Sequence, residues 1–189
     1  MKKLNFIIKC GLALLLLSFY SCESWLNVTP SDRLSEEMLF NDREGFVKAL
    51  NGVYIELNTN ELYGRNLTAG ALDVMGQYYS VASSSHAFYN YGGLVYTGND
   101  EKALFDNMWQ KCYAVIACCN TIIEKCDENK AGLSPVWRGS IKGEALALRA
   151  MLHFDMLRLF GPLTSELDKE SIPYQTNSDQ TVTPLLSGS

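Results

Sequence analysis

The sequence carries no excess of positive charge. Among its 189 residues, 16 are Lys or Arg and 21 are Asp or Glu, which gives a formal net charge of −5. Lys2, Lys3 and Lys9 lie within the first 21 residues, and the remainder has 13 basic against 21 acidic side chains, a net charge of −8. Proteins that bind nucleic acid neutralise phosphates with clustered Lys and Arg. The charge balance therefore argues against nucleic acid as a partner.

The sequence also contains no pattern that specifies catalysis. It has no nucleophile motif, no Gly-rich phosphate loop and no cluster with metal-ligand spacing. Glycoside hydrolysis needs two carboxyl groups at a defined separation, and no acidic pair is marked by its position. We therefore expect a protein that is not an enzyme and binds no cofactor or metal. A surface glycosidase stays as a competing hypothesis.

The longest apolar run is too short to span a bilayer. Cys10 to Tyr20 is 11 residues long and would rise only about 16 Å as a helix, about half of a ~30 Å hydrocarbon core. Lys2 and Lys3 give this segment a basic start. The pattern predicts a secretory signal peptide over residues 1–21.

Cys22 directly follows this segment and has two interpretations. It is either an ordinary cysteine near a cleavage site or a bacterial lipoprotein cysteine, acylated after cleavage. The preceding residues match a lipobox imperfectly, because Phe19 replaces the usual Leu and Tyr20 a smaller residue. We favour lipidation at Cys22, since several acyl chains on one residue would anchor the protein durably.

Residues 22–42 are predicted to form a lipid-anchored tether. Thr29 and Pro30 are turn formers, so this segment is expected to run extended over the surface. Three of its apolar side chains should dock on the domain that follows: Trp25, Leu26 and Val28.

The strongest helical pattern lies between Ser140 and Pro162. One apolar stripe recurs every three or four residues, and a second apolar set covers much of the remaining circumference. Such a helix is expected to be surrounded by other helices, and Gly161 followed by Pro162 ends it. The stripe consists of Ile141, Ala145, Leu148, Leu152, Met156 and Leu159; the second set consists of Ala147, Ala150, Met151, Phe154 and Leu157.

Other helices are expected on both sides of a long loop. The spacing predicts a helix over 43–57, capped by Asn41 or Asp42, and a shorter one over 67–78. A helix over 101–127 should pair with 135–160 as an antiparallel hairpin, with Trp109 on its inner face and Ala145 and Ala147 allowing close approach. The predicted class is all-α, built from tetratricopeptide-like helical hairpins with long irregular loops.

Four further cysteines are interpreted as small buried hydrophobic residues. Cys112, Cys119 and Cys126 are seven positions apart, about 10 Å along a helix, which is too far for a disulfide or a shared metal. Cys118 is assigned to the same class.

The segment 77–99 contains the candidate ligand-binding residues. It combines serines, a Gly-Gly pair and many aromatic residues without helical period, and long loops inside compact domains are often functional. Aromatic rings suit the apolar faces of sugars, while amides and imidazole can bind the hydroxyl rim. Half of the six Tyr and Phe rings in this segment are expected to be buried against the helices instead of contacting ligand. A short extended segment is expected at Leu94 to Thr97. The candidates are Tyr78, Tyr79, His86, Phe88, Tyr89, Asn90, Tyr91, Tyr96 and Asn99.

Two polar residues stand out on the helix over 135–160. Glu144 and Arg149 could bind a ligand, but we favour buried residues satisfied by pairing and by loop carbonyls. From Thr164 onward the chain is polar and irregular. Thr183 to Ser187 then resembles the opening of another helix, which predicts that the sequence is a fragment.

These motifs together resemble the N-terminal part of the SusD/RagB family of Bacteroidetes outer-membrane lipoproteins. The resemblance runs from Cys22 to the last residue and includes WLNVTPSDRLS, FVKALNGVY, MWQKCYAVIACCNTII and GEALALRAMLHFDMLRLFGP. The family's W-x3-Y-x2-I-x3-N pattern falls on Trp109, Tyr113, Ile116 and Asn120. Its G-E-A…R-A pattern falls on Gly143, Glu144, Ala145, Arg149 and Ala150.

The resemblance implies that residues 43–189 are an incomplete SusD-like helical domain. It implies a glycan-binding lipoprotein of starch-utilisation type on the outside of the outer membrane. Its partners would be an oligosaccharide and a SusC-like TonB-dependent transporter. A surface lipoprotein that serves only as a structural platform remains the other alternative.

Overall fold

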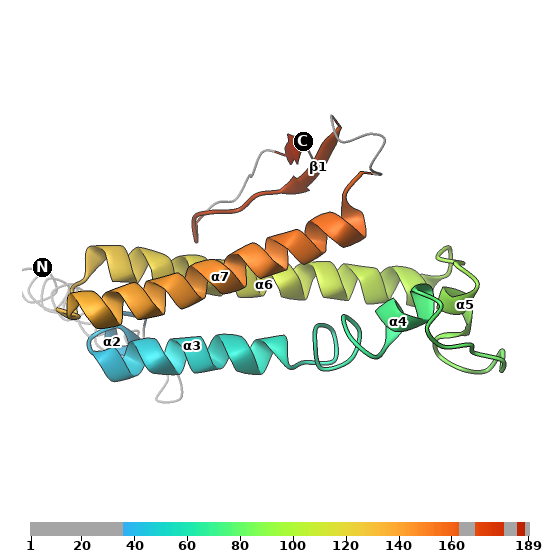
Figure 1. Ribbon diagram of the computed structural model, residues 1–189, viewed down its shortest axis with the longest axis horizontal. Coiled ribbons are helices and arrows are strands. Elements are labelled where there is room, and N and C mark those ends of the chain that lie inside the picture. Colours follow the sequence, from blue (N-terminus) through green and yellow to red (C-terminus); the bar gives the residue numbers. More distant parts are fainter. Residues whose placement is uncertain (1–35, 163–168, 180–184, 188–189) are drawn as a thin grey trace, which may run out of the picture. The chain divides into compact units, whose positions relative to one another are not determined.

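The computed structural model describes residues 36–162, 169–179 and 185–187. The chain divides into two compact units, residues 1–38 and 39–189, and the helical core belongs to the second. The predicted signal peptide, Cys22 and the predicted tether up to residue 35 lie outside the described residues. Within the described residues there are six helices and two short strands, so the fold is mostly helical, as expected (Figure 1). The tetratricopeptide-like arrangement stays a prediction.

Helix α3 (Arg43–Leu57) has the bounds that the sequence predicts. Its N-terminus is capped by Asp42, whose carboxylate accepts a 2.8 Å hydrogen bond from the amide of Gly45, the usual way to satisfy a free N–H group there. One face is buried at four positions of helical spacing: Phe46, Leu50, Val53 and Leu57.

Helices α6 (Asn99–Glu128) and α7 (Pro135–Phe160) form the predicted antiparallel hairpin (Figure 1). The connection begins at Asn129, which adopts a left-handed conformation with φ 48°. Ser134 caps α7 by accepting a bond from the amide of Trp137, and Pro135 occupies its first turn. Helix α3 packs on both helices. The core lies between the three and includes Phe46, Met108, Ile116, Leu152 and Met156.

The expectation that α7 is enclosed on all sides is wrong for the described residues. The first apolar stripe is buried except for Leu159, which is partly buried. The second set is largely exposed, with Phe154 58% and Met151 39% exposed. Helices α3 and α6 cover one side of α7, and no described helix covers the other. Ala145 is fully buried, whereas Ala147 is exposed and plays no part in the close approach. Apolar composition alone therefore overstated the burial of this helix.

The smaller elements depart further from expectation. Helix α2 (Glu36–Leu39) falls in the stretch expected to run extended. Helix α4 (Ala71–Met75) is shorter than predicted, and α5 (Tyr89–Gly92) forms inside the expected loop. Leu94 to Thr97 forms no strand.

Two strands form near the C-terminal end of the sequence. Strand β1 (Glu170–Pro173) pairs antiparallel with β2 (Leu185–Ser187). The expected helix start is thus wrong over 185–187, because pairing with β1 outweighs the local Thr-Pro signal. The fold is mostly helical but not strictly all-α.

The cysteines follow the prediction with one exception. Cys112, Cys119 and Cys126 are buried and Cys118 is exposed, all four as free thiols. Adjacent helical residues point about 100° apart, so Cys118 and Cys119 cannot share the inner face. Burial raises the pKa of Cys112 and of Cys119 to about 12, which makes these thiols unreactive. No group of potential metal ligands occurs among the described residues.

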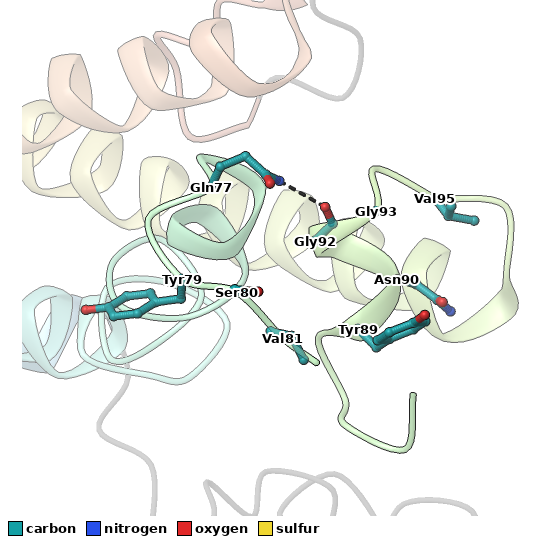
Figure 2. Close-up of a pocket in the computed structure, with 9 residues that line it drawn as sticks. All are labelled: Gln77, Tyr79, Ser80, Val81, Tyr89, Asn90, Gly92, Gly93 and Val95. Carbon is teal, nitrogen blue, oxygen red and sulfur yellow. Dashed lines mark hydrogen bonds between the residues drawn. The ribbon is translucent and has the colours of Figure 1, made fainter. Parts of the chain in front are cut away.

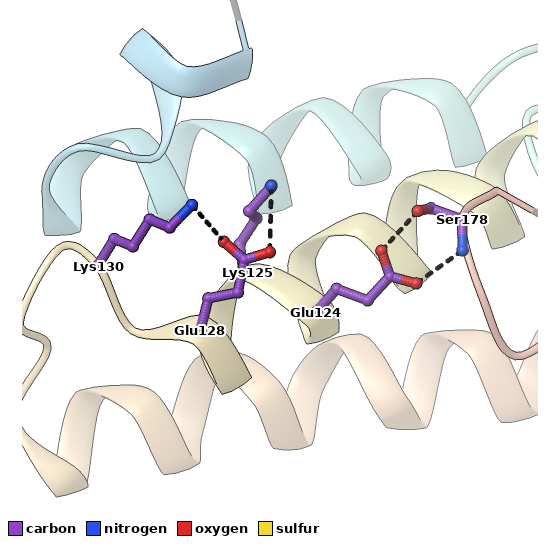
Figure 3. Close-up of polar contacts among 5 residues, drawn as sticks. All are labelled: Glu124, Lys125, Glu128, Lys130 and Ser178. Carbon is purple, nitrogen blue, oxygen red and sulfur yellow. Dashed lines mark hydrogen bonds and ion pairs between the residues drawn. The ribbon is translucent and has the colours of Figure 1, made fainter.

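The segment after α7 returns across the hairpin and is held by α6 side chains. Tyr113 donates a 2.8 Å bond to the carbonyl of Pro173, and Asn120 donates to the carbonyls of Gln175 and Asn177, each at 3.3 Å. Figure 3 shows Glu124 accepting two bonds from Ser178, at 2.7 and 2.5 Å. Nearby, the Glu128 carboxylate lies between Lys125 and Lys130, at 3.5 and 3.2 Å.

Helix α7 holds the same segment from its side. Arg149 donates to the side-chain oxygen of Asn120 at 2.9 Å and to the carbonyl of Thr176 at 3.2 Å. The ring of His153 accepts a bond from the amide of Gln175 at 3.1 Å. These contacts fit the structural interpretation of Arg149.

Glu144 differs from the expectation that it is a buried polar residue. Its side chain is exposed and accepts a 2.7 Å bond from the hydroxyl of Tyr54 on α3.

Trp109 is half-buried and packs edge-on against Phe160 of α7, with ring centroids 5.0 Å apart. No helix in the described part of the chain is both long enough and apolar enough to cross a membrane.

Candidate functional site

A cavity of ≈330 Å³ lies where the segment after α4 meets α5 and the residues that follow it (Figure 2). This volume falls at the lower end of the ~300–1,000 Å³ typical of small-molecule sites. Nine residues line it: Gln77, Tyr79, Ser80, Val81, Tyr89, Asn90, Gly92, Gly93 and Val95. The cavity therefore lies within the loop that the sequence nominated.

Gln77 joins the two walls of this cavity. Its backbone is left-handed, with φ 61°, so the chain turns away from α4 at this residue. Its side-chain nitrogen donates to the carbonyl of Gly92 at 2.9 Å and to that of Val74 at 3.3 Å. The first of these bonds spans from the α4 side to the end of α5, as Figure 2 shows.

Two tyrosines line the cavity and stay open to solvent. Tyr79 is 57% exposed and Tyr89 42% exposed. They come from the two different walls, and in Figure 2 the ring of Tyr79 points away from the wall that holds Tyr89. Exposed aromatic rings beside hydrogen-bonding groups provide flat apolar surface together with polar contacts. A ligand with apolar faces and a rim of hydroxyl groups matches this lining.

Three of the six candidate rings pack in an aromatic cluster, but among them only Tyr91 is buried, while Phe88 and Tyr96 are partly buried. Phe88, Tyr91 and Tyr96 join Phe105 of α6 in an aromatic cluster with centroid separations of 5.4–6.4 Å. Tyr91 is only 2% exposed. Burial raises its pKa, and the carboxylates of Glu101 and Asp100 raise it further. A ligand could not reach the ring of Tyr91, and Tyr96 does not line the cavity. We therefore leave both out of the site.

Asn90 connects the cavity to the start of α6. Its side-chain nitrogen donates a 2.7 Å bond to the Glu101 carboxylate. Glu101 is buried in the first turn of α6, where the helix dipole favours negative charge. Asn90 is the one amide among the predicted residues that lines the cavity.

The remaining candidates lie outside the cavity lining. Tyr78 is 81% exposed, and Asn99 is the first residue of α6. His86 is exposed and packs on Phe88 at 5.8 Å. Of the nine candidates, Tyr79, Tyr89 and Asn90 thus line one cavity, and the other six do not.

Sequence reasoning missed Gln77, the residue that ties the walls. Its position two residues before Tyr79 gave no signal, because its role depends on a left-handed backbone. The Gly-Gly pair was noted only as a loop feature, yet Gly92 and Gly93 both line the cavity.

A second cavity of ≈320 Å³ lies between α7 and β1 and was not predicted. Phe154 and Tyr174 line it, and its one ionisable imidazole, His153, is occupied by bonds to the backbone. It offers fewer free polar groups than the first cavity. We therefore place the candidate site at the cavity that contains Tyr79 and Tyr89.

Comparisons with known proteins agree with the resemblance. The SusD-like_3 family, described as starch-binding and associating with the outer membrane, matches residues 24–185. "SusD-like protein P2" of Formosa agariphila is 25% identical over 166 residues, which cover 85% of this chain and 30% of that protein. The chain thus spans less than a third of the length of this curated relative. No solved structure matches it.

The family match extends from residue 24, before the helical core, to residue 185 in β2. SusD-like proteins are typically binding proteins without catalytic activity, and the family has, in general, a glycan-binding role at the outer membrane. The match covers far more than half of the sequence, and the chain therefore belongs to the SusD-like family.

Proposed function

We propose that this chain is part of a surface lipoprotein that captures oligosaccharides in the cavity lined by Tyr79 and Tyr89. The captured glycan is passed to a SusC-like TonB-dependent transporter in the same outer membrane. Cys22 carries the lipid anchor, and the domain faces the exterior. The family match supports the general role, while the ligand site, the anchor and the transporter are proposals.

The pair of half-exposed tyrosines on one cavity carries this proposal. A pyranose ring has an apolar C–H face and a polar rim, so it can stack on a tyrosine while its hydroxyls bind nearby amides. Tyr79 and Tyr89 supply the rings. Gln77, Ser80 and Asn90 supply polar groups beside them.

Single alanine variants test the site against a matched control. Tyr79→Ala and Tyr89→Ala should each weaken oligosaccharide binding at least about tenfold, as expected for the loss of a stacked ring at a binding hot spot. Tyr78→Ala removes the same side chain next to the cavity without changing its lining and should bind like the parent. Calorimetry on the full-length protein measures the affinity, and melting curves exclude unfolding.

The outcomes separate the competing functions. If all three variants bind like the parent, the glycan site lies elsewhere in the protein. Release of reducing sugar from a glycan panel would support the glycosidase hypothesis. If the full-length protein binds no glycan at all, a structural surface lipoprotein becomes the better account.

A further inference from the structure

The two amide side chains of the cavity both turn their donor groups toward the protein. The Gln77 nitrogen donates to two backbone carbonyls, those of Val74 and Gly92. An amide nitrogen has two hydrogens, so these bonds occupy its full donor capacity. What Gln77 keeps for a ligand is its carbonyl oxygen, which has no partner among the described residues.

The orientation of Asn90 is fixed in the same sense. The side-chain nitrogen of Asn90 donates to a carboxylate oxygen of Glu101 at 2.7 Å, so its amide nitrogen faces Glu101 and its oxygen faces away from it. The oxygen of Asn90 then has no partner within the described part of the chain. Two hydrogen-bond acceptors, from Gln77 and Asn90, thus belong to the same cavity lining as Tyr79 and Tyr89.

No Lys or Arg in the described part of the chain forms an ion pair with the carboxylate that binds Asn90. Glu101 is buried and, among the described residues, forms no ion pair with Lys or Arg. It lies so close to Gly98 that a Cβ there would fall 2.0 Å from a carboxylate oxygen, which shows how tightly this group is packed. None of the nine residues that line the cavity is Lys, Arg or His.

We propose that this cavity selects neutral oligosaccharides, whose hydroxyl groups donate to Asn90 and Gln77, and rejects glycans that carry carboxylate or sulfate groups. This selectivity rests on the proposed glycan-binding function and names its substrate class. Hydroxyl groups can donate to both amide oxygens. An anionic group would lose its hydration next to acceptor oxygens and the buried Glu101 carboxylate, with no cation to compensate.

The binding test compares matched neutral and acidic sugars. The probes are an array of neutral oligosaccharides and an array of uronic-acid and sulfated oligosaccharides, including the pairs tetragalactose with tetragalacturonic acid and tetramannose with tetramannuronic acid. We expect binding from the neutral array, with at least tenfold weaker binding of each acidic counterpart.

A charge variant tests the mechanism. Val95 is an exposed residue of the cavity wall, and Leu94 is its exposed neighbour outside the lining. Val95→Lys supplies the missing cation and should reduce the preference for neutral glycans at least about fivefold. Leu94→Lys adds the same charge outside the cavity and should leave the preference unchanged. Glu101→Gln removes the buried carboxylate and should also reduce the preference for neutral glycans, with melting curves to confirm that the variant is folded.

The possible failures are distinguishable. An acidic glycan that binds as tightly as its neutral counterpart, and loses affinity in Tyr89→Ala, overturns the selectivity but keeps the proposed function. Equal effects of Val95→Lys and Leu94→Lys also overturn it. Glycan binding that Tyr89→Ala leaves unchanged contradicts the proposed site, and no binding from either array contradicts the proposed function itself.

Discussion

Replacing Asn120 by alanine should destabilise the protein by about 2–4 kcal/mol. Asn120 is fully buried, donates to the carbonyls of Gln175 and Asn177, and accepts from Arg149. Each neutral hydrogen bond contributes ~0.5–1.5 kcal/mol and one to a charged group ~1.5–3 kcal/mol. Water can reach the partly exposed carbonyls, and alanine gains ~0.5 kcal/mol of helix propensity, so the net loss lies below the sum.

Urea unfolding of the purified protein measures this loss. A matched control is Gln110→Ala, an exposed position on the same helix, where the change should stay within ~0.5 kcal/mol. The melting temperature of the Asn120 variant should fall by about 5–15 °C, given ~2–4 °C per kcal/mol for a protein of this size.

A double-mutant cycle identifies the partner. Asn120→Ala and Arg149→Ala should be non-additive by at least ~1 kcal/mol, because the second change removes a bond that the first has already broken. If Asn120→Ala destabilises the protein no more than Gln110→Ala, or if the effects of Asn120→Ala and Arg149→Ala are additive, the hydrogen bonds of Asn120 to the 173–178 segment do not contribute to stability.

Three further predictions concern other parts of the chain. Burial lowers the pKa of His153 below its usual value near 6.5, and its ring accepts a bond from Gln175 only when neutral. The contribution of His153 to stability should therefore be full above about pH 6.5 and be lost as the pH drops through the lowered pKa. Urea unfolding at several pH values should show this dependence in the parent and a flatter one in His153→Gln. Trp109→Ala should lower the free energy of unfolding by about 2–4 kcal/mol, less than the loss of a fully buried indole. The control Trp137→Ala, on the exposed side of α7, should lower it by under ~1 kcal/mol. Equal destabilisation of the two variants in thermal melts would mean that Trp109 does not stabilise the hairpin. Cys22→Ala should abolish incorporation of labelled fatty acid in a bacterial host, and unchanged labelling would rule out the lipid anchor.

The sequence predicted those elements whose ends carry local signals. The bounds of α3 and α7 are confirmed to the residue, because Asp42 and Ser134-Pro135 mark their starts. Apolar spacing also identified the buried stripe of each. These features depend on residues within one turn of each other, so the sequence contains them directly.

Features that depend on distant neighbours were not predictable in the same way. Apolar residues on both sides of α7 say nothing about whether a neighbour covers each side, and Phe154 is exposed. Leu185 to Ser187 follows a helix-start signal but pairs with β1 instead.

The same limit applies to the candidate site. The loop and its aromatic character were predictable, but the direction of each ring was not. Tyr89 and Tyr91 both belong to α5, yet one lines the cavity while the other is buried against Phe105. The acceptor orientation of Asn90 depends on Glu101, eleven residues away, and so on the packing of α5 against α6.

A crystal structure of the full-length protein with a bound neutral oligosaccharide tests the central claim most directly. The account predicts one sugar ring stacked on Tyr79 or Tyr89, with hydroxyl groups within hydrogen-bond distance of the Asn90 and Gln77 oxygens. Sugar density confined to another part of the protein, with this cavity holding only water, would contradict it.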